Sequence, residues 1–371
     1  MNETTYVCSE CGAKLTPEEM HEFEGQVYCE DCLDDLTVLC DCCSRRIFRD
    51  DAEGNDSITL CARCYEDRYT TCDECGCLIP NGDVYYDDDS DYAYCESCFR
   101  KAKERPIHSY SYKPEPIFYG SESDLYMGVE LEIDKGGELD EKAEQLLNLA
   151  NYSDERIYCK HDGSLHDGFE VVSHPMTLDY HIKKMNWKEL FEKAVEMHYA
   201  SHNTCTCGFH IHCSRDAFGE DNATQDSCIG RLIYFVEKHW DELVRFSRRS
   251  ADALDRWAAR YATISNTAQE TYKKAKDKRM GRYVAINLEN YETVEFRMFR
   301  GTLRYETFIA TLQLVAEICA TAIALTDGQM ESLSWSEFVS RIDQERSPEL
   351  IDYLKSKRLY VNEISDEGEE A

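Results

Sequence analysis

The sequence lacks the short glycine-rich motifs that cradle nucleotide phosphates. Neither G-x-G-x-x-G nor G-x4-G-K-[ST] follows a strand-like run, which excludes the ordinary dinucleotide-binding and P-loop folds. Basic residues are also scarce, since 41 Lys and Arg stand against 73 Asp and Glu, a net charge of −32. Such a chain repels phosphate backbones at long range, so no nucleic-acid partner is expected.

Long apolar segments are few as well. The first residues, MNETTYVCSE, are polar and predict no secretory signal. The most apolar helix-like run, residues 307–325, carries Gln313 and Glu317 near its middle and is interpreted as a buried helix rather than a membrane span. We therefore expect a cytoplasmic protein without a membrane partner, in which thiols stay reduced.

Twenty cysteines are abundant for such a protein and point to metal rather than to disulfides. Pairs of the form C-x2-C recur with a period of 32 residues in three repeats, 8–32, 40–64 and 72–98. Four thiolates at this spacing are typical of a tetrahedral structural zinc site. The predicted zinc ligands are Cys8, Cys11, Cys29, Cys32, Cys40, Cys43, Cys61, Cys64, Cys72, Cys75, Cys95 and Cys98. Cys42 and Cys77 are left over, and each is either a spare thiol or a replacement ligand.

The repeats fill residues 1–103. FEGQVYCEDCLDDL has the order aromatic residue, glycine turn, C-x2-C and short helix, and LCARCYEDRY and AYCESCFRKA repeat the helix start. These segments resemble LIM-like treble-clef modules, although the consecutive units lie further apart than the halves of a LIM domain. Units this small bury little core, so zinc would hold them together. The resemblance implies that they fix domain geometry or bind a protein partner.

The composition changes after the repeats. Residues 104–123 hold three of the seven prolines and predict an extended linker. Residues 124–345 mix strand-like and helix-like segments, which favours an α+β domain built on an antiparallel sheet. Residues 346–371 predict a C-terminal helix followed by an acidic tail. The strand-like runs are 125–133, 168–173, 207–213, 282–288 and 292–299, and the helix-like runs are 138–150, 179–199, 226–248, 304–326 and 335–343.

Charged residues and histidines alternate with apolar ones on several of these strands. In GVELEID, Glu130 and Glu132 lie two residues apart and therefore share one face of a strand. The ionisable residues found in this way on separate strands are Glu130, Glu132, Glu170, His210, His212, Glu295 and Arg297. The same alternation predicts that Phe299 shares a face with Glu295 and Arg297. A solvated sheet face explains each residue when it is taken alone.

If these strands form one sheet, their polar faces meet. Clustered carboxylates repel one another, and a divalent cation relieves that repulsion. Oxygen ligands favour Mg²⁺ or Mn²⁺, while the imidazoles leave Mn²⁺ or Zn²⁺ open. Arg297 and Arg300 provide planar donors suited to phosphate, and residues 245–282 form a local basic stretch with 11 Lys and Arg. The pattern predicts a nucleotide-triphosphate site without a P-loop.

Three further cysteines flank the histidine strand. Cys205, Cys207 and Cys213 lie beside GFHIH. They offer a further metal site, but buried small side chains are the preferred interpretation.

Four motifs, GVELEI, DGSL…GFEVVSHP, GFHIH and RYVAINL…TVEFRMFRGTL, occur in this order. Over about residues 125–325 they resemble the amidoligase family, relatives of γ-glutamylcysteine synthetase and glutamine synthetase. The resemblance implies a curved antiparallel sheet with helices on its outer side. It also implies ATP-dependent joining of a carboxylate to an amine through an acyl phosphate, with Mg²⁺ or Mn²⁺, to form an amide or isopeptide bond. Such ligases are frequent in bacteria and phages.

The resemblance also implies roles for individual residues. The catalytic and metal-binding set would be Glu130, Glu132, Glu170, His212, Glu295 and Arg297, with Arg297 on phosphate. His210 stays an alternative to His212. The residues toward nucleotide or substrate would be Lys160, Asp162, His210, Arg297 and Arg300.

A ligase is favoured over a non-catalytic zinc adaptor, because the acidic, histidine and arginine positions are all occupied. The amine is expected to be a free amino acid, a peptide, a cell-wall fragment or a protein side chain, and the zinc modules favour a macromolecular partner.

Overall fold

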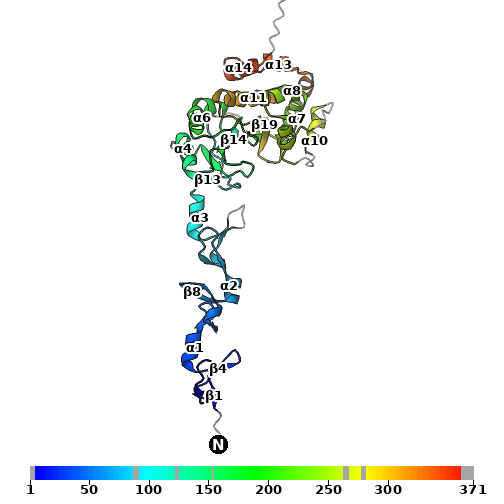
Figure 1. The fold of residues 1–371 in the computed structure, drawn as a ribbon. Coiled ribbons are helices and arrows are strands. Elements are labelled where there is room, and N and C mark those ends of the chain that lie inside the picture. Colours follow the sequence, from blue (N-terminus) through cyan, green and yellow to red (C-terminus); the bar gives the residue numbers. More distant parts are fainter. Residues whose placement is uncertain are drawn as a thin grey trace, which may run out of the picture. The chain divides into compact units, whose positions relative to one another are not determined.

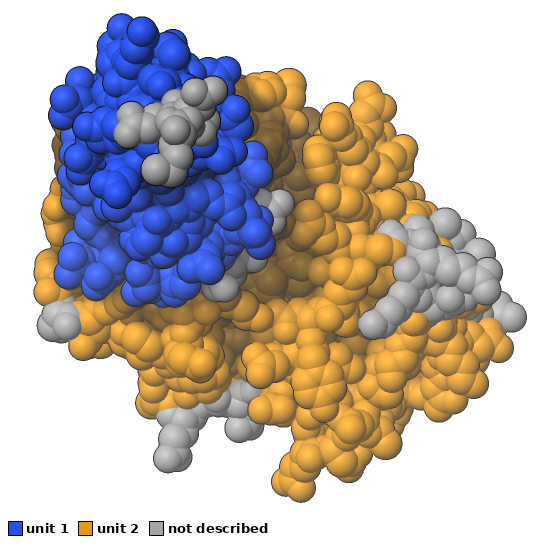
Figure 2. All heavy atoms as spheres, turned by 90° about the horizontal axis from the view of Figure 1, so that it is seen from below, with its two compact units in different colours: residues 1–104 blue, residues 105–371 orange. Residues whose placement is uncertain are grey.

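The structure is a computed structural model and describes residues 5–86, 92–121, 125–152, 154–261, 267–276 and 281–360. The chain divides into two compact units, Met1–Glu104 and Arg105–Ala371, which are coloured separately in Figure 2. The last residues of the expected acidic tail, 361–371, lie outside the described residues.

The first unit consists of three similar modules, each with short hairpins followed by a helix (Figure 1). In each module the first cysteine of the second C-x2-C pair, Cys29, Cys61 or Cys95, is the N-cap of the helix. The strands are β1 (Tyr6–Val7), β2 (Lys14–Leu15), β3 (His21–Phe23), β4 (Gln26–Tyr28), β5 (Thr37–Leu39), β6 (Arg46–Phe48), β7 (Ala52–Asn55), β8 (Ile58–Cys61), β9 (Tyr69–Thr71), β10 (Leu78–Pro80), β11 (Tyr85–Tyr86) and β12 (Ala93–Tyr94). The helices are α1 (Glu30–Leu36), α2 (Ala62–Arg68), α3 (Glu96–Lys103) and the 3-10 turns η1 (Arg49–Asp51) and η2 (Asn81–Asp83).

The modules have very small apolar cores. The buried residues of the first module are Cys8, Leu15, Tyr28 and Leu33, and the second and third modules bury four and three residues, most of them cysteines. Clusters of this size supply little hydrophobic stabilisation. The cysteines therefore occupy the positions where a larger domain would have its core.

The second unit is built on a seven-stranded sheet in the order β13-β15-β16-β14-β17-β19-β18. The strands are β13 (Ile107–His108), β14 (Met127–Ile133), β15 (Ile157–Lys160), β16 (Phe169–Ser173), β17 (Gly208–Ser214), β18 (Ile286–Asn287) and β19 (Thr293–Arg300). The sequence predicted a fully antiparallel sheet. The observed sheet is mixed, because β13 pairs with β15 in parallel. All other neighbouring strands are antiparallel.

The parallel strand comes from the segment that was expected to be a linker. Residues 105–121 belong to the second unit, where β13 adds an edge strand and Tyr119 forms a bridge with Met176. A two-residue strand carries too little alternation to be visible in a sequence that is rich in proline and tyrosine. This segment therefore differs from a free linker in its structure.

Helices cover the apolar face of the sheet (Figure 1). Phe308, in the long helix Tyr305–Ala324, stacks on Phe209 of β17 with 4.7 Å between the ring centroids. It also contacts Trp187 and Phe191. The helices are α4 (Asp140–Ala150), α5 (Leu178–Lys183), α6 (Trp187–Glu196), η3 (Arg215–Phe218), α7 (Asn222–Lys238), α8 (Trp240–Ser247), α9 (Ala251–Trp257), α10 (Ala268–Lys276), α11 (Tyr305–Ala324), α12 (Asp327–Ser332), α13 (Trp335–Ser340) and α14 (Pro348–Ser356). The expected helix 226–248 is two helices, because the backbone leaves helical geometry at His239.

Helix α11 is long and apolar enough to cross a membrane by length and composition alone, yet 72% of its apolar window is buried inside the second unit. Gln313 in its middle is fully buried and bonded, donating to Glu349 at 2.7 Å and accepting from the backbone N–H of Leu350. The expectation of a buried core helix is confirmed.

Strand β19 contains a β-bulge that decides which residues face which way. Phe296 pairs with Ile211 and Phe299 pairs with Phe209, so β19 uses one more residue than β17 over this stretch. Phe299 consequently lies on the apolar face, 2% exposed, and packs on Phe246. The prediction that Phe299 shares a face with Glu295 was wrong, because strict alternation ends at the bulge.

Two buried histidines should make the second unit sensitive to acid. His181 is fully buried, its Nε2 lies 2.9 Å from the carbonyl oxygen of Met127, and its Nδ1 accepts a hydrogen bond from Trp187. Burial lowers the pKa of His181, and likewise of His239, to about 4. Their contribution to stability is therefore complete above pH 6.5 and is lost as the pH falls toward 4, on the order of a few kcal/mol in total.

The substitution His181→Gln tests this, since glutamine can make both hydrogen bonds but does not titrate. We expect the free energy of unfolding to fall less between pH 7 and pH 5 in this variant than in the wild type, measured by urea titration of tryptophan fluorescence. His166→Gln, at an exposed position, is the control. Equal pH dependence in all three proteins would contradict the expectation.

Candidate active site

The register of the central strands brings the predicted residues into neighbouring rows on the polar face of the sheet. One row runs from Lys160 through Glu170 to Glu132. Glu130 pairs with His210 in the next row, and His212 with Glu295 in the one after. Directly opposed residues of antiparallel strands project to the same side. Five strands thus deliver these side chains to one surface.

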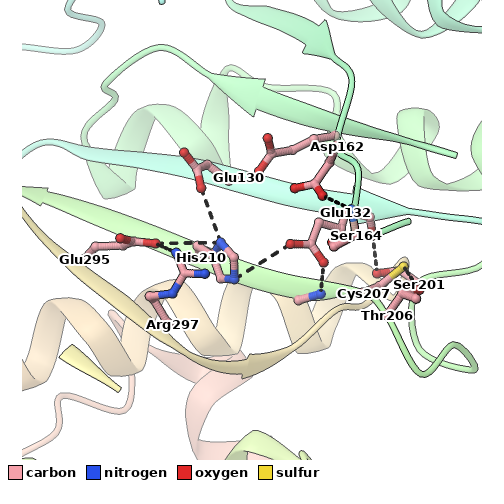
Figure 3. A network of polar contacts seen from close by, with 12 residues as sticks. Glu130, Glu132, Asp162, Ser164, Ser201, Thr206, Cys207, His210, Glu295 and Arg297 are labelled. Carbon is pink, nitrogen blue, oxygen red and sulfur yellow. Dashed lines mark hydrogen bonds and ion pairs between the residues drawn. The ribbon is translucent and has the colours of Figure 1, made fainter. Parts of the chain in front are cut away.

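His210 lies at the centre of this surface (Figure 3). Its Nδ1 is 3.2 Å from Oε2 of Glu130 and 3.7 Å from Oε1 of Glu295. Its Nε2 is 3.9 Å from Oε1 of Glu132. The His210 side chain is 6% exposed, so one nearly buried imidazole contacts three carboxylates from two neighbouring strands.

Two groups of potential metal ligands meet at Glu130. The first is Glu130, His212 and Glu295, and the second is Glu130, Glu170 and His210, with all ligand atoms of each group within 4.8 Å of one another. The Nε2 atom of His212 is buried and has no hydrogen-bond partner among the described residues, although Oε1 of Glu130 lies 3.2 Å away. Both histidines therefore lie in potential ligand groups, and the geometry excludes neither of them.

The partly exposed Glu130 and the buried Glu170 have opposite pKa shifts. Burial favours the neutral form of Glu130, but the positive charge of His212 and the hydrogen bond with His210 outweigh it and hold its pKa well below the usual range. Burial and repulsion from Glu130 raise the pKa of Glu170 far above its usual range, despite Lys160 with its Nζ 3.2 Å away. The cluster thus holds more carboxylates than the cations of the chain neutralise.

Glu132 is fixed by the backbone of the neighbouring strand. Its Oε2 accepts a hydrogen bond from the N–H of Gly208, and burial raises its pKa. A Cβ at Gly208 would lie 2.8 Å from Nε2 of His210 and 3.3 Å from a guanidinium nitrogen of Arg249. Any side chain at position 208 would collide with His210 and Arg249, so this position requires glycine.

Asp162 lies in the turn that follows β15, at the edge of the cluster (Figure 3). Its carboxylate accepts the backbone N–H of Ser164 at 2.7 Å. Its negative charge adds to the rise in the pKa of both Glu132 and Glu170. The turn therefore brings one more acid next to the row of Lys160, Glu170 and Glu132.

Arg297 is the cation at the opposite side of the cluster. It is ion-paired with Glu295, and its Nε is buried with no hydrogen-bond partner among the residues that the structure describes. Asn287, which was not predicted, donates to the other oxygen of Glu295 at 2.7 Å. Alternation in the strand-like run 282–288 was a signal for Asn287, because it places this side chain opposite Glu295.

Arg249 is a further site residue that was not predicted individually. It is 9% exposed, and its Nη1 donates to the carbonyl oxygen of Arg297 at 2.6 Å. It lies beyond the end of α8, where no strand or helix period applies. The only sequence signal was the basic stretch 245–282. Arg300, which was predicted, follows the bulge and pairs with Gly208 at the end of the same polar face.

A cavity of about 1000 Å³ adjoins the cluster and is lined by Glu130, Lys160 and His212. Its wall includes Tyr110, Tyr112 and other residues of the segment 110–118, together with Tyr158 of the sheet. A cavity of this size suits a ligand as large as a nucleotide or a small peptide.

The cysteine groups of the first unit have the composition expected for zinc. Cys8, Cys11, Cys29 and Cys32 form one group, and Cys40, Cys43, Cys61 and Cys64 form another. Backbone N–H groups, chiefly that of Cys11, bond to the thiol of Cys8 and lower its pKa to about 6. All twenty cysteines are free thiols. Such groups can hold zinc, since thiolates are its preferred structural ligands.

The two leftover cysteines lie at these groups. Cys77 joins Cys72, Cys75 and Cys95 within ligand distance, while Cys98 is hydrogen-bonded to Cys75 and Cys95. The third group therefore has five thiols. Cys42 is hydrogen-bonded to Cys64 of the second group and accepts from Arg68 at 3.4 Å.

Five thiols should make the third site tolerant of a lost ligand. We expect the Cys77→Ser protein to keep the zinc of its third module. Cys11→Ser removes one of the four thiols of the first module and should weaken zinc binding there at least about a hundredfold. Loss of a residue that only supports a metal ligand already weakens binding by up to about this factor. Competition with a chromogenic chelator on the whole chain measures both. Equal weakening would show that Cys77 is an obligatory ligand.

The three cysteines beside GFHIH differ in their burial. Cys213 is fully buried on the apolar face with its Sγ 3.8 Å from that of Cys319. Burial raises the pKa of Cys207 to about 12. Cys205 is exposed. For Cys207 and Cys213 the structure agrees with the preferred interpretation of buried small side chains.

Comparison with known proteins adds one finding. The profile of a family described as "Putative amidoligase enzyme" matches residues 124–319, which is more than half of the 371 residues and includes every strand of the polar face from β14 to β19. No curated protein matches the chain. The resemblance drawn from the four motifs is confirmed, and the chain belongs to the amidoligase family.

Proposed function

We propose that this protein is an ATP-dependent carboxylate–amine ligase that forms an amide or isopeptide bond through an acyl phosphate. One observation carries the proposal: four strands bring Glu130, Glu170, His210, His212 and Glu295 together on one face, beside a cavity of about 1000 Å³. Family membership supports amide-bond ligase activity. The ATP dependence rests on the chemistry of this face.

The donor set fits divalent cations. Carboxylate oxygens with one imidazole per group suit Mg²⁺ or Mn²⁺, and the raised pKa of Glu170 and the free Nε2 of His212 fit a cluster that takes up cations. We assign Glu130, Glu170, Glu295 and the two histidines as ligands, with Glu132 beside them. When bound, the ions would neutralise charge on the triphosphate and on the leaving diphosphate.

The cations of the chain would position the phosphates. Lys160 on one side and Arg297 on the other flank the acidic rows, and the buried free Nε of Arg297 is a donor available to a phosphate oxygen. Arg249 holds the backbone of Arg297 and so acts as a positioning residue. We assign Asp162 to the edge of the nucleotide site.

The reaction has two steps. A carboxylate oxygen of the first substrate attacks the γ-phosphorus, the bond to ADP breaks, and an acyl phosphate forms. The nitrogen of the second substrate then attacks the acyl carbon, inorganic phosphate leaves, and the amine loses a proton. Both steps need reactants held in line and shielded from water, which a half-buried face beside a cavity favours.

We also propose that the second unit has a glutamine synthetase-like fold, since the central strands are antiparallel, the helices cover the apolar face, and the polar face is left open for ligands. The three cysteine modules would each hold one structural zinc, resemble LIM-like treble clefs, and recruit a macromolecular substrate or partner. Their thiols suit a reducing, cytoplasmic location.

The test uses the whole zinc-loaded chain with ATP, Mg²⁺ and a panel of carboxylates, amines and peptides. We expect sustained ADP formation only when both substrates are present, and we expect hydroxylamine, added in place of the amine, to convert the acyl phosphate to a hydroxamate. Binding of Mg²⁺–ADP is measured separately by calorimetry. If no nucleotide binds, the ligase proposal fails and the zinc-adaptor alternative replaces it.

A further inference from the structure

A second cavity, of about 870 Å³, lies in the second unit apart from the one described above. It is enclosed by residues 199–203, the chain around the start of α11, and α14. Its lining includes four basic side chains, those of His202, Arg248, Arg304 and Lys357, and three acidic ones, those of Glu306, Glu349 and Asp352. In a chain with a net charge of −32, such a gathering of basic groups needs a physical reason.

Arg248 is the best-defined of these groups. It ends helix α8 in the left-handed region, with φ +62°, a conformation that is uncommon outside glycine. Its Nη2 donates to the carbonyl oxygen of Arg300 at 3.2 Å, and its Nη1 lies 3.5 Å from Nδ1 of His202. Its Nε is buried without a hydrogen-bond partner among the described residues, so the guanidinium has an unused donor.

Among the four basic side chains of the lining, only Arg304 forms an ion pair within the described residues. Within the described part of the chain, no carboxylate lies within 4.0 Å of Arg248, Arg300 or Lys357. Arg304 pairs with Glu306 at 3.5 Å, and Glu349 on the same wall is engaged by Gln313. Burial, together with repulsion from Arg248 and Arg304, lowers the pKa of Lys357. These cations repel one another, and a bound anion would relieve that repulsion.

The cavity begins where the polar face of the sheet ends. Ser201, on the cavity wall, donates to the backbone carbonyl of Glu132 at 2.8 Å. Arg300, turned to the polar face by the bulge, pairs with Gly208 and is held through its carbonyl by Arg248. The wall of this cavity therefore adjoins the end of the polar face at Glu132 and at Arg300.

We propose that this cavity binds an oxyanion of the substrate, a carboxylate that does not itself react, so that the enzyme selects an acidic amino acid or a peptide bearing such a group. The inference rests on the proposed ligase function and deepens it by naming the substrate class. Paired guanidinium and ammonium donors are the groups that proteins use for carboxylate and phosphate. A phosphoryl group is the other source of the same chemistry.

The experiment measures binding of two probes, glutarate and inorganic phosphate, to the whole zinc-loaded chain by calorimetry at low and at moderate salt. Lys357→Gln and Arg248→Gln should each weaken glutarate binding about tenfold, the usual effect of losing one charge-assisted hydrogen bond. Lys355→Gln is the matched control, since Lys355 lies exposed on the same helix, packs over Tyr360, and is not part of the cavity lining.

Each outcome decides the matter. Weaker glutarate binding in the two cavity variants alone supports the proposal as stated. If only phosphate binding weakens, the cavity is an oxyanion site for a phosphoryl group and the carboxylate assignment is overturned. Equal binding in all variants overturns the site. If Arg248→Gln fails to fold, Lys357→Gln still tests the site. The Lys357 side chain is half-exposed and makes no hydrogen bond or ion pair within the described residues, so its replacement should leave the fold intact.

Binding of Mg²⁺–ADP is measured in the same proteins to separate this proposal from the ligase proposal. We expect it to be unchanged in Lys357→Gln. If the wild type binds glutarate but no nucleotide, the ligase proposal fails while the anion site stands. If it binds nucleotide but neither probe, only the anion site is overturned.

Discussion

Replacing Glu130 by glutamine should abolish ligation and lower the turnover rate at least about a thousandfold. This factor is the upper end of the effect of removing one group that stabilises charge in a transition state. Glu130 is the residue common to both potential ligand groups and contacts both histidines at 3.2 Å. An amide keeps the volume of the side chain but removes the anionic charge. One substitution therefore weakens both proposed cation positions at once.

The fold should survive this change. The Glu130 side chain is 21% exposed, and the backbone pairing of β14 with β16 and β17 does not depend on it. Far-UV circular dichroism and thermal unfolding measure this, alongside ADP release. Glu141→Gln, at an exposed position on α4, is the matched control. An unfolded Glu130→Gln protein would assign the residue a structural role instead, and full activity would remove it from the site.

Removing zinc should unfold the first unit and leave the second unit folded. The first unit buries clusters of only three or four residues per module, so three metal sites worth roughly 10–16 kcal/mol each would supply most of its stability. The second unit has a large continuous core around α11 and the sheet. We therefore expect its stability to be independent of the cysteine groups.

Hydrogen exchange resolved by peptide, before and after treatment with a strong chelator, measures the two units in one sample. We expect protection to vanish in residues 5–104 and to persist in β14, β17 and α11. Metal analysis should give three zinc ions per chain, and Cys205→Ser should leave that number unchanged. Protection that survives chelation in the first unit would contradict a structural role for zinc.

The polar face could be predicted because strand alternation is a local property. Residues two positions apart on one strand lie on the same face. The sequence alone therefore predicts that Glu130 shares a face with Glu132, and His210 with His212. Which strands are neighbours does not follow. The rows that join Lys160 to Glu170, and Glu130 to His210, come from the pairing of segments 10 to 80 residues apart.

The parts that could not be predicted lie where periodicity ends. Arg248 and Arg249 follow a helix terminus, and their directions depend on a left-handed turn and on hydrogen bonds to β19. Strand β13 is two residues long and parallel to its neighbour. Burial of Glu170 and Glu295 to 3% exposure is also a tertiary effect, since a solvated face explained the same pattern equally well.

The extra residue in β19 has a consequence for recognising relatives of this chain. It places Arg297 and Arg300, three positions apart rather than two, at the same surface, with Phe299 turned inward between them. A relative that lacks the insertion would need R-x-R in place of R-x-x-R to present the same two groups. An alignment of this chain with such a relative, made without a gap, would then place an arginine opposite the core residue Phe299. The alignment would score the similarity too low, although the three-dimensional arrangement is the same.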